Sequence, residues 1–250
     1  MTTLGADVEI FLSQNGNPTP AINLLGGSKT KPSPVAYGNL QEDNVMAEFA
    51  IDPAESKDQW VRHLNAVFRE LMNTVGDQYE PMILPSCQFP DEMLTHPKAR
   101  EFGCDPDINA YTLDMGAYSP DQVGNLRTCG GHIHVGEPMT NDEIIDIVQA
   151  MDMFLGVPSV LADEDDNRRR FYGQAGSFRV KDYGLEYRSL SNFWIRTDGL
   201  MEWAYDAAIQ AVQFIKNGNQ VPEEVQNIIN NSDRDGARRF IRDHNLKEAA

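Results

Sequence analysis

Titratable side chains alternate with apolar ones in three short segments of this chain, residues 5–12, 131–136 and 184–190. Successive side chains of a β-strand point to opposite faces of a sheet, so this period of two predicts strands with one apolar and one polar face. In the first segment Asp7 and Glu9 share a face, and the flanking valine and isoleucine form the buried one. These two carboxylates fit either a solvated edge or a cleft.

Apolar residues recur at helical spacing in three further segments, residues 56–75, 141–156 and 198–216. Thr140 or Asn141 caps the second of these helices, which is expected to stop near the Gly-Val-Pro sequence of residues 156–158. Gly218 ends the third. The order strands, helix, strands, helix, strand, helix predicts an α+β domain with helices packed against a mainly antiparallel sheet.

Turn-forming residues divide the rest of the chain. The Asn-Gly-Asn-Pro sequence at residues 15–18 predicts a hairpin, and a second strand pair is expected to flank residues 41–44. Residues 76–128 contain proline and glycine breaks, and only a short strand near residues 82–84 is expected there. From Pro222 onward the sequence predicts two short helices with a polar break at residues 230–236. We therefore expect a main domain over residues 1–218 and a C-terminal helical tail over residues 219–250.

The formal net charge of −17 over 250 residues restricts the classes of partner. Nucleic-acid binders carry a basic face, so nucleic acid is not an expected partner. A nucleotide such as ATP is still compatible, because divalent metals held by clustered carboxylates reverse the local sign of the charge. No apolar run approaches the roughly 20 residues that span a bilayer, and the first residues lack a signal-peptide pattern. We expect a soluble, cytoplasmic protein with no membrane partner.

The three cysteines are Cys87, Cys104 and Cys129. An odd number without a CxxC pair indicates neither a disulfide framework nor a zinc ribbon. Reduced thiols that act mainly as small buried groups fit this pattern.

Three further features are candidates for chemistry. Glu48 lies in an otherwise apolar strand, where a charged group either faces outward or binds a cation. His132 and His134 share a strand face between glycines, which is typical of a metal or phosphate site, although a core histidine is an open alternative for each. Glu186 and Arg188 have the same spacing, which also fits a plain ion pair.

A basic cluster precedes the last of these strands. Residues 168–170 are all arginine, and Arg179 follows a Tyr-Gly-Gln-Ala-Gly-Ser sequence. In so acidic a chain this cluster is a candidate polyphosphate clamp. The alternative is that the arginines balance the acidic residues 163–166.

Five motifs then occur in order along residues 4–200: GADVE at 5–9, AEFAIDP at 47–53, GGHIHVG at 130–136, RRFYGQAGSFR at 169–179 and GLEYRSLSNFW at 184–194. Together they resemble the phage-associated carboxylate–amine ligase family called COOH·NH2 ligase type 2. That family is grouped with glutamate–cysteine ligases and glutamine synthetase. The resemblance implies a glutamine-synthetase-like catalytic fold, with a curved, mainly antiparallel sheet, over residues 1–218.

The resemblance also implies roles for individual residues. It implies that Glu9, Glu48 and Glu186 bind Mg²⁺, with Asp7 as a further candidate, and that His132 or His134 contacts metal or nucleotide phosphates. It implies that the remaining candidates contact phosphate or the substrate carboxylate, namely Arg188, Arg179, Arg169, Arg170 and, in a Gly-rich loop without Walker spacing, Lys29. Glu48, Glu186 and Arg188 are the expected catalytic residues.

The activity that this resemblance implies is ATP-dependent joining of a carboxylate to an amine through an acyl phosphate, with Mg²⁺. The substrates would be amino acids, peptides or protein side chains, in the host cytoplasm if the protein is phage-encoded, and homo-oligomerisation is left open. A phosphotransferase of the same fold, a zinc-dependent hydrolase and a catalytically silent binding protein are the alternatives.

Overall fold

A computed structural model describes residues 1–100, 107–116, 124–163 and 166–249. Its main sheet has the strand order β3-β4-β5-β1-β11-β13-β12-β8-β9, with β2 and β6 also paired to β1, and every strand pair on this path is antiparallel. These strands are β1 (Thr3–Gln14), β2 (Asn17–Thr19), β3 (Ser33–Val35), β4 (Gly38–Asp43), β5 (Met46–Ile51), β6 (Glu80–Met82), β8 (Asp107–Asn109), β9 (Met115–Gly116), β11 (Gly131–Gly136), β12 (Ser177–Lys181) and β13 (Gly184–Tyr187). A separate ribbon pairs β7 (Ser86–Gln88) with β10 (Leu126–Thr128). The α+β class and the mainly antiparallel sheet are confirmed.

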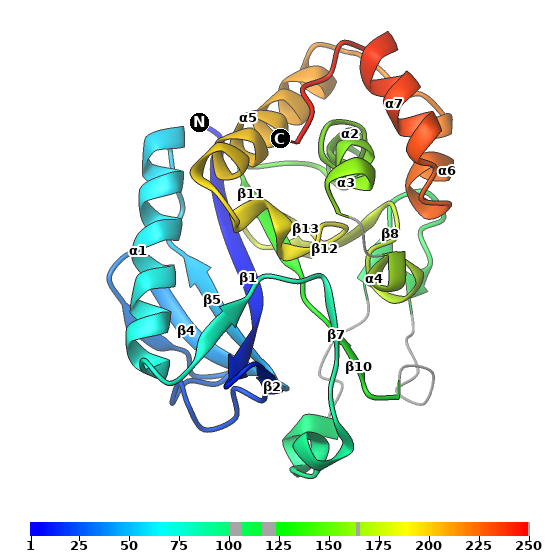
Figure 1. Cartoon of the computed structure of the whole chain (residues 1–250). Coiled ribbons are helices and arrows are strands. Elements are labelled where there is room, and N and C mark those ends of the chain that lie inside the picture. Colours follow the sequence, from blue (N-terminus) through cyan, green and yellow to red (C-terminus); the bar gives the residue numbers. More distant parts are fainter. Residues whose placement is uncertain (101–106, 117–123, 164–165, 250) are drawn as a thin grey trace.

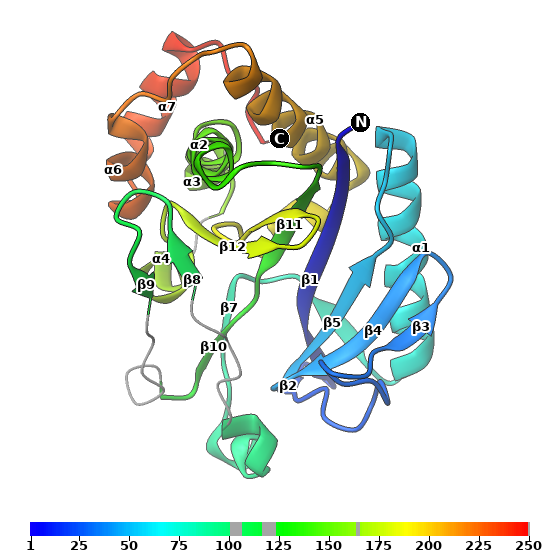
Figure 2. The ribbon, with the colours of Figure 1, turned by 180° about the vertical axis from the view of Figure 1, so that it is seen from behind.

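Helices pack on one face of the sheet. They are α1 (Lys57–Val75), α2 (Asn141–Met151), α3 (Val157–Ala162), α4 (Asp166–Phe171), α5 (Asp198–Lys216), α6 (Glu224–Asn230) and α7 (Arg234–Asp243). In Figure 1 α1 and α5 lie in front of the strands, whereas the view from behind in Figure 2 shows the strands in front. The even-numbered residues of β1 from Leu4 to Leu12 are fully or almost fully buried in a core shared with α1, α2 and α5. The odd-numbered residues therefore face away from this core.

The capping residues confirm where α1, α2 and α5 were expected to begin. Ser56 and Thr197 accept hydrogen bonds from backbone N–H groups at the starts of α1 and α5. Thr140, one of the two alternatives, caps α2 in a complete capping box with Glu143. The end of α2 is different from the prediction.

The helix does not stop near residues 156–158. A π-helical turn, Asp152–Gly156, follows α2 and leads directly into α3, where Pro158 lies in the first turn. A proline lacks the N–H that an α-helix requires, and the wider π turn together with the start of a new helical segment accommodates it. Asp152 in this turn accepts hydrogen bonds from Tyr187 Oη (2.7 Å) and Ser189 Oγ (3.3 Å), so the turn is tied to the end of β13.

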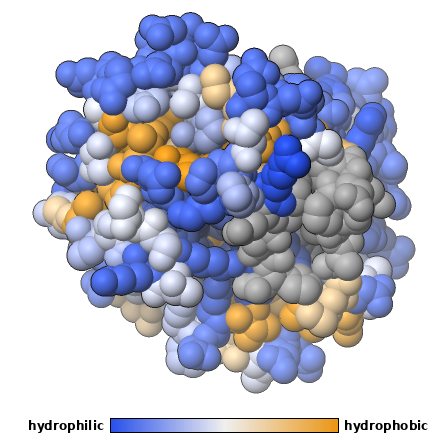
Figure 3. Space-filling model, turned by 90° about the horizontal axis from the view of Figure 1, so that it is seen from below, coloured by the Kyte–Doolittle hydropathy of each residue, from blue (hydrophilic) through white to orange (hydrophobic). Residues whose placement is uncertain are grey.

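This continuation also lengthens the apolar run beyond the sequence-based expectation. Within the described residues, the stretch Asn141–Ala162 is long and apolar enough to cross a membrane by length and composition. However, 72% of the most apolar part of this stretch is buried inside the molecule. Packing in the protein core accounts for its composition. The surface seen from below in Figure 3 is mostly hydrophilic, with hydrophobic residues in separate patches.

The C-terminal helices pack against the rest of the chain. Val225, Ile228 and Ile229 of α6 and Phe240 of α7 form a second buried cluster with residues of α3 and the π turn, including Val160. The two short helices and the break between them are as expected, although the break spans residues 231–233 and Gly236 lies inside α7. The division at residue 218 stays a prediction.

Two features of the strands differ from the sequence-based expectation. The turn between β4 and β5 lies at Asn44 and Val45, so residues 41–43 belong to β4. Asn44 adopts a positive φ of 57°, which asparagine tolerates better than most residues and which suits a two-residue hairpin. Residues 177–181, for which the sequence predicts no element, form β12, which pairs with β13.

Candidate active site on the open face of the sheet

The antiparallel register brings the alternating residues of separate strands together. Glu9 on β1 lies opposite Glu48 on β5, and Glu48 lies opposite Gln41 on β4. Paired residues in neighbouring strands place their side chains on the same face, so these three groups form one row. Gln41 Nε2 donates a 2.6 Å hydrogen bond to Glu48 Oε2.

A second group of residues lies beside this row. Asp7 on β1 is opposite His132 on β11, and His134 is opposite Glu186 on β13, which in turn is opposite Arg179 on β12. The three pairs of the sequence pattern therefore meet on one sheet face, the face opposite to the helices. Asp7 and Glu9 therefore line a cleft and not a solvated edge.

This cleft is a cavity of about 280 Å³. Its lining combines five carboxylates, four cationic side chains, one histidine and one amide: Asp7, Glu9, Asp43, Glu48, Glu186, Lys29, Arg179, Lys181, Arg188, His132 and Gln41. The acidic residues come mainly from β1, β4 and β5, and the basic residues mainly from β12 and the segment that follows β13. The cavity thus has an acidic half and a mixed half.

Burial opposes ionisation in the acidic half. Loss of hydration, together with the nearby Asp43 carboxylate, raises the pKa of Glu9 to about 7. Burial and the charges of Asp7, Asp43 and Glu9 raise the pKa of Glu48 well above its usual value, and burial raises that of Asp43. The Glu9 carboxylate accepts a hydrogen bond from the Gly130 N–H (2.5 Å). Clustered carboxylates of this kind are stabilised by a bound cation.

Glu186 lies at the centre of the other half. Lys181 Nζ is 2.6 Å and Arg179 Nη1 3.8 Å from its carboxylate, and Arg188 also pairs with it. Burial alone would raise the pKa of Glu186, but the charges of Arg188 and its other neighbours hold it well below the usual value. Glu186 is therefore an anion that orients three cationic side chains.

The two histidines have different environments. His132 is buried, and loss of hydration together with the Arg188 charge lowers its pKa well below 6.5. Its Nδ1 lies 3.1 Å from Arg188 Nη1, which can only donate, so His132 is a neutral acceptor. His134 is more accessible and lies 3.1 Å from the Asp7 carboxylate and 2.5 Å from Tyr183 Oη.

Two glycines make this arrangement possible. A side chain at Gly130 would collide with the His132 ring, and one at Gly131 would approach Ser191 O to 2.5 Å. The expectation that glycines next to the histidines permit close approach is confirmed.

The donor set suits a hard divalent cation. Asp7, His134 and Glu186 offer ligand atoms that all lie within 4.8 Å of one another, and Glu9, Glu48 and Asp43 add carboxylates along the same cavity. Oxygen donors of this kind are preferred by Mg²⁺. His134 lies beside the Asp7 carboxylate, whereas the Nδ1 atom of His132 lies beside Arg188. The metal role predicted for His132 stays a prediction.

Not all predicted residues reach the cavity. Arg169 is buried elsewhere and binds the Ser159 carbonyl (2.9 Å) and Asp166 (3.5 Å), and Arg170 is exposed. Neither lines the cleft, because within α4 Arg169 packs toward α3 and Arg170 faces solvent. For Arg169 the alternative reading, counter-charge to the acidic segment, is the one that the structure supports. Residues 164 and 165 of that segment, and Cys104, lie outside the described residues.

Four residues of the site were missed from the sequence. Gln41 and Asp43 alternate like the other pairs but were placed in a turn. Lys181 follows Arg179 at the same spacing, a signal that was not used because no strand was predicted there. Asp107 Oδ1 forms ion pairs with Arg188 Nε (2.8 Å) and Arg179 Nε (3.2 Å), and no sequence pattern points to Asp107.

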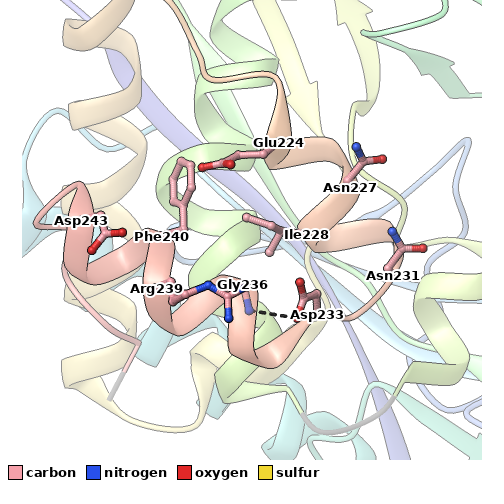
Figure 4. Close-up of a pocket in the computed structure, with 9 residues that line it drawn as sticks. All are labelled: Glu224, Asn227, Ile228, Asn231, Asp233, Gly236, Arg239, Phe240 and Asp243. Atoms are coloured by element: carbon pink, nitrogen blue, oxygen red, sulfur yellow. Dashed lines mark hydrogen bonds between the residues drawn. The ribbon is translucent and has the colours of Figure 1, made fainter.

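A second cavity, shown in Figure 4, lies between α6 and α7. It contains none of the predicted residues. Its Asp233 caps α7 by accepting from the Gly236 N–H (2.9 Å), so this carboxylate has a structural role.

One comparison with known proteins, the family match, bears on the main prediction. A family model described as "Phage phiEco32-like COOH.NH2 ligase-type 2" matches residues 122–242, just under half of the chain. The match supports the prediction of an enzyme that forms amide bonds. No curated protein sequence matches the chain. Among solved structures, a bifunctional glutathione synthetase from Pasteurella multocida superimposes with a TM-score of 0.44 at 12% identity, over 86% of this chain. The chain spans 40% of the length of that structure.

Proposed function

We propose that this protein is an ATP-dependent carboxylate–amine ligase that activates the acid as an acyl phosphate, within a glutamine-synthetase-like catalytic fold. One observation carries the proposal: a cluster of buried carboxylates and a cluster of cations share a single cavity on one sheet face. Phosphoryl transfer depends mainly on positioning and on neutralisation of charge, and these two clusters supply both. The family match over residues 122–242 covers β11, β12 and β13, which carry the mixed half of the cavity.

The acidic half would hold the divalent metal. The residues that would bind it are Glu9, Glu48, Asp43, Asp7 and His134. A bound cation would favour the ionised carboxylates and so lower the raised pKa values of Glu9 and Glu48. Bound Mg²⁺ would supply charge neutralisation for the nucleotide phosphates. Without it, a polyphosphate would be repelled by these carboxylates.

The mixed half would receive the transferred phosphoryl group. Arg179, Lys181 and Arg188 are held beside Glu186, which fixes their positions before substrate binds. Such preorganised cations stabilise charge that develops in a transition state, and removal of one typically costs about 10²–10³ in kcat. Lys29, at the other side of the cavity, would contact the nucleotide phosphates.

A zinc-dependent hydrolase is the second candidate, and the grouping of Asp7, His134 and Glu186 is the observation that favours it. It ranks lower because Glu186 is already neutralised by Lys181 and Arg188, contacts that a zinc ligand would have to give up. A phosphotransferase of the same fold would use the same cavity but would release no inorganic phosphate.

The test is transfer of isotope from acid to phosphate. The chain is incubated with Mg-ATP, candidate amines and ¹⁸O-labelled acids, and the label in released inorganic phosphate is measured. Label in phosphate is expected for the wild-type chain, and its loss is expected for Glu186→Gln and Glu48→Gln variants that retain the wild-type circular dichroism spectrum. ADP formation without phosphate release would indicate the phosphotransferase, and zinc-dependent, ATP-independent hydrolysis would indicate the hydrolase.

A further inference from the structure

A smaller cavity of about 240 Å³ adjoins the candidate active site. Its lining is polar: Asp107, Ile108, Asn109, Thr112, Asp114, Gln174, Ser177, Gln226 and Asn230. These residues come from β8, the turn before β9, the start of β12 and helix α6. We call it the side cavity.

The side cavity and the active-site cavity share a wall. Asp107 lines the side cavity, accepts a hydrogen bond from Ser177 Oγ (2.8 Å) and forms an ion pair with Arg188 Nε (2.8 Å), a residue that lines the active site. Along β12, Ser177 lines the side cavity and Arg179 lines the active site. Residues two apart on a strand lie about 7 Å from each other on the same face. A small ligand in the side cavity can therefore reach the cations that are proposed to bind phosphate, Arg179 and Arg188.

The linings on the two sides of the active site differ in charge. The side cavity is lined by two carboxylates and four amide side chains, and no lysine or arginine is among its described lining residues. On the opposite side, a further cavity shares Lys29 and Asp43 with the active site and adds Lys98 and Glu42, so that two lysines balance two carboxylates. An anionic nucleotide is repelled less on the side with the lysines, and a cationic group is favoured in the side cavity.

Hydrogen bonds between asparagine side chains and the backbone build the side cavity. Asn109 Nδ2 donates to the Ala175 carbonyl (3.0 Å), and Asn109 Oδ1 accepts from the Tyr111 N–H (2.9 Å). Asn230 of α6 accepts from the Ala175 N–H (2.8 Å). These bonds hold β8, the loop before β12 and α6 against one another, so the wall formed by Gln226 is part of a defined structure.

We propose that the side cavity binds the amine substrate as a primary ammonium, and that it favours amines without a carboxylate beside the ammonium group. This inference rests on the proposed ligase function. Asp107 is already paired with Arg188 and Arg179, so Asp114 is the carboxylate that attracts the ammonium. The charge of Asp114 repels the carboxylate of a free amino acid, and no lysine or arginine is among the described lining residues to bind that carboxylate. The acceptor is then an amino-acid amide, a peptide N-terminus or a lysine side chain. The volume, which is below that of sites for drug-sized ligands, suits a group of this size.

The reaction balances with this assignment. The ammonium loses one proton to become a neutral amine, whose nitrogen attacks the acyl carbon, and the nitrogen loses a second proton after the C–N bond forms. The C–N bond forms while the C–O bond to phosphate breaks, and phosphate leaves with the electron pair of that bond. Of the two protons lost by the ammonium overall, one ends on the released phosphate and one in solvent.

The experiment separates activation of the acid from capture of the amine. The full chain is incubated with Mg-ATP, a panel of acids and hydroxylamine, a small uncharged nucleophile that traps an acyl phosphate as a hydroxamate. Alanine amide and alanine are then added as competing amines, and kcat/KM is measured for each. Asp114→Asn and Gln226→Leu are compared with Asp77→Asn, a control in which the aspartate is exposed in a turn and lines neither cavity.

The expected result is at least about tenfold preference for alanine amide over alanine, the effect of one charge-assisted contact. Asp114→Asn should raise KM for alanine amide about fivefold to tenfold and narrow this preference, while hydroxamate formation stays unchanged. A merely structural role for Asp114 would lower hydroxamate formation as well and leave the preference intact.

Three outcomes would overturn the inference. If hydroxamate forms but both amines are used equally, or if neither variant changes the KM for the amine, the amine-binding role of the side cavity is refuted. The ligase function still stands in that case. Failure of both amines to compete in the wild-type chain would also refute the amine-binding role. Absence of hydroxamate and of isotope transfer for every acid would refute the ligase function, and the inference with it.

Discussion

Glu9 and Glu48 lie directly opposite each other on adjacent antiparallel strands, and each side chain is only 7% exposed. Two buried carboxyl groups on the same face of a sheet destabilise a fold when both are ionised, unless a cation lies between or beside them. Their position therefore links metal binding, pH and stability in this protein.

The stability of the metal-free protein should fall as the pH rises. The pKa of Glu9 is raised from 4.5 to about 7, so between these values the folded state binds more protons than the unfolded state, and the free energy of unfolding decreases with increasing pH. For Glu9 alone the full loss is about 3 kcal/mol. We expect the midpoint of thermal unfolding in EDTA to be lower at pH 8 than at pH 5.5, and Mg²⁺ to reduce the difference.

Glu9→Gln is the matched variant for this measurement. It keeps the shape of the side chain and removes the titration, so its pH dependence between 5 and 8 should be flatter than that of the wild-type protein. An equal slope in both proteins would show that Glu9 ionises normally in the folded state. Histidine titrations are common to both proteins and cancel in the comparison.

Removal of Glu186 should impair both folding and turnover. Glu186→Gln leaves Lys181, Arg179 and Arg188 clustered without their anion, and breaking a buried ion pair in this way typically costs about 3–5 kcal/mol. We expect a fall in kcat of at least about 10²-fold with little change in the KM for ATP. Urea unfolding and initial rates measure the two effects, and wild-type stability in the variant would contradict the burial and pairing of this carboxylate.

Neighbouring arginines provide a matched pair for a positioning role. Arg168 is buried, and its guanidinium donates to the carbonyl groups of Ser189 (2.7 Å) and Arg188 (3.1 Å), whereas Arg170 is exposed. Arg168→Lys cannot make both bonds and should lower the unfolding free energy by about 1–3 kcal/mol. It should also reduce kcat, because the backbone that carries Arg188 loses its support.

Arg170→Lys should leave both quantities unchanged within error, since surface substitutions typically stay within about 0.5 kcal/mol. If both variants behave alike, Arg168 does not hold Arg188 in place.

The C-terminal helices should unfold together with the sheet. Phe240 of α7 is 2% exposed in a cluster with residues of α3, so Phe240→Ala should cost about 3–5 kcal/mol in a single unfolding transition. Arg242→Ala, an exposed change on the same helix, is the control. A separate early transition in the Phe240 variant would show that residues 219–250 form an independent tail.

The sequence by itself determined the local structure and most of the candidate site. Its period-two pattern gave β1, β11 and β13, and its helical pattern gave α1, α2 and α5, because these periodicities reflect which face of each element is buried. For the same reason the members of each pair could be assigned to one face of their own strand: Asp7 with Glu9, His132 with His134, and Glu186 with Arg188.

Only the tertiary structure decided which of these residues meet. Register across strands that are distant in sequence joined Glu48 to Gln41 and Glu9, and brought Asp107 to Arg188, a contact between residues 81 positions apart for which no local pattern exists. Packing of α4 against α3 likewise removed Arg169 from the site, although its sequence motif resembles a phosphate clamp. The alternation of polar and apolar residues can be recognised from neighbouring positions in the sequence. The pairing of strands depends on the burial of the whole sheet, which a single sequence indicates less directly.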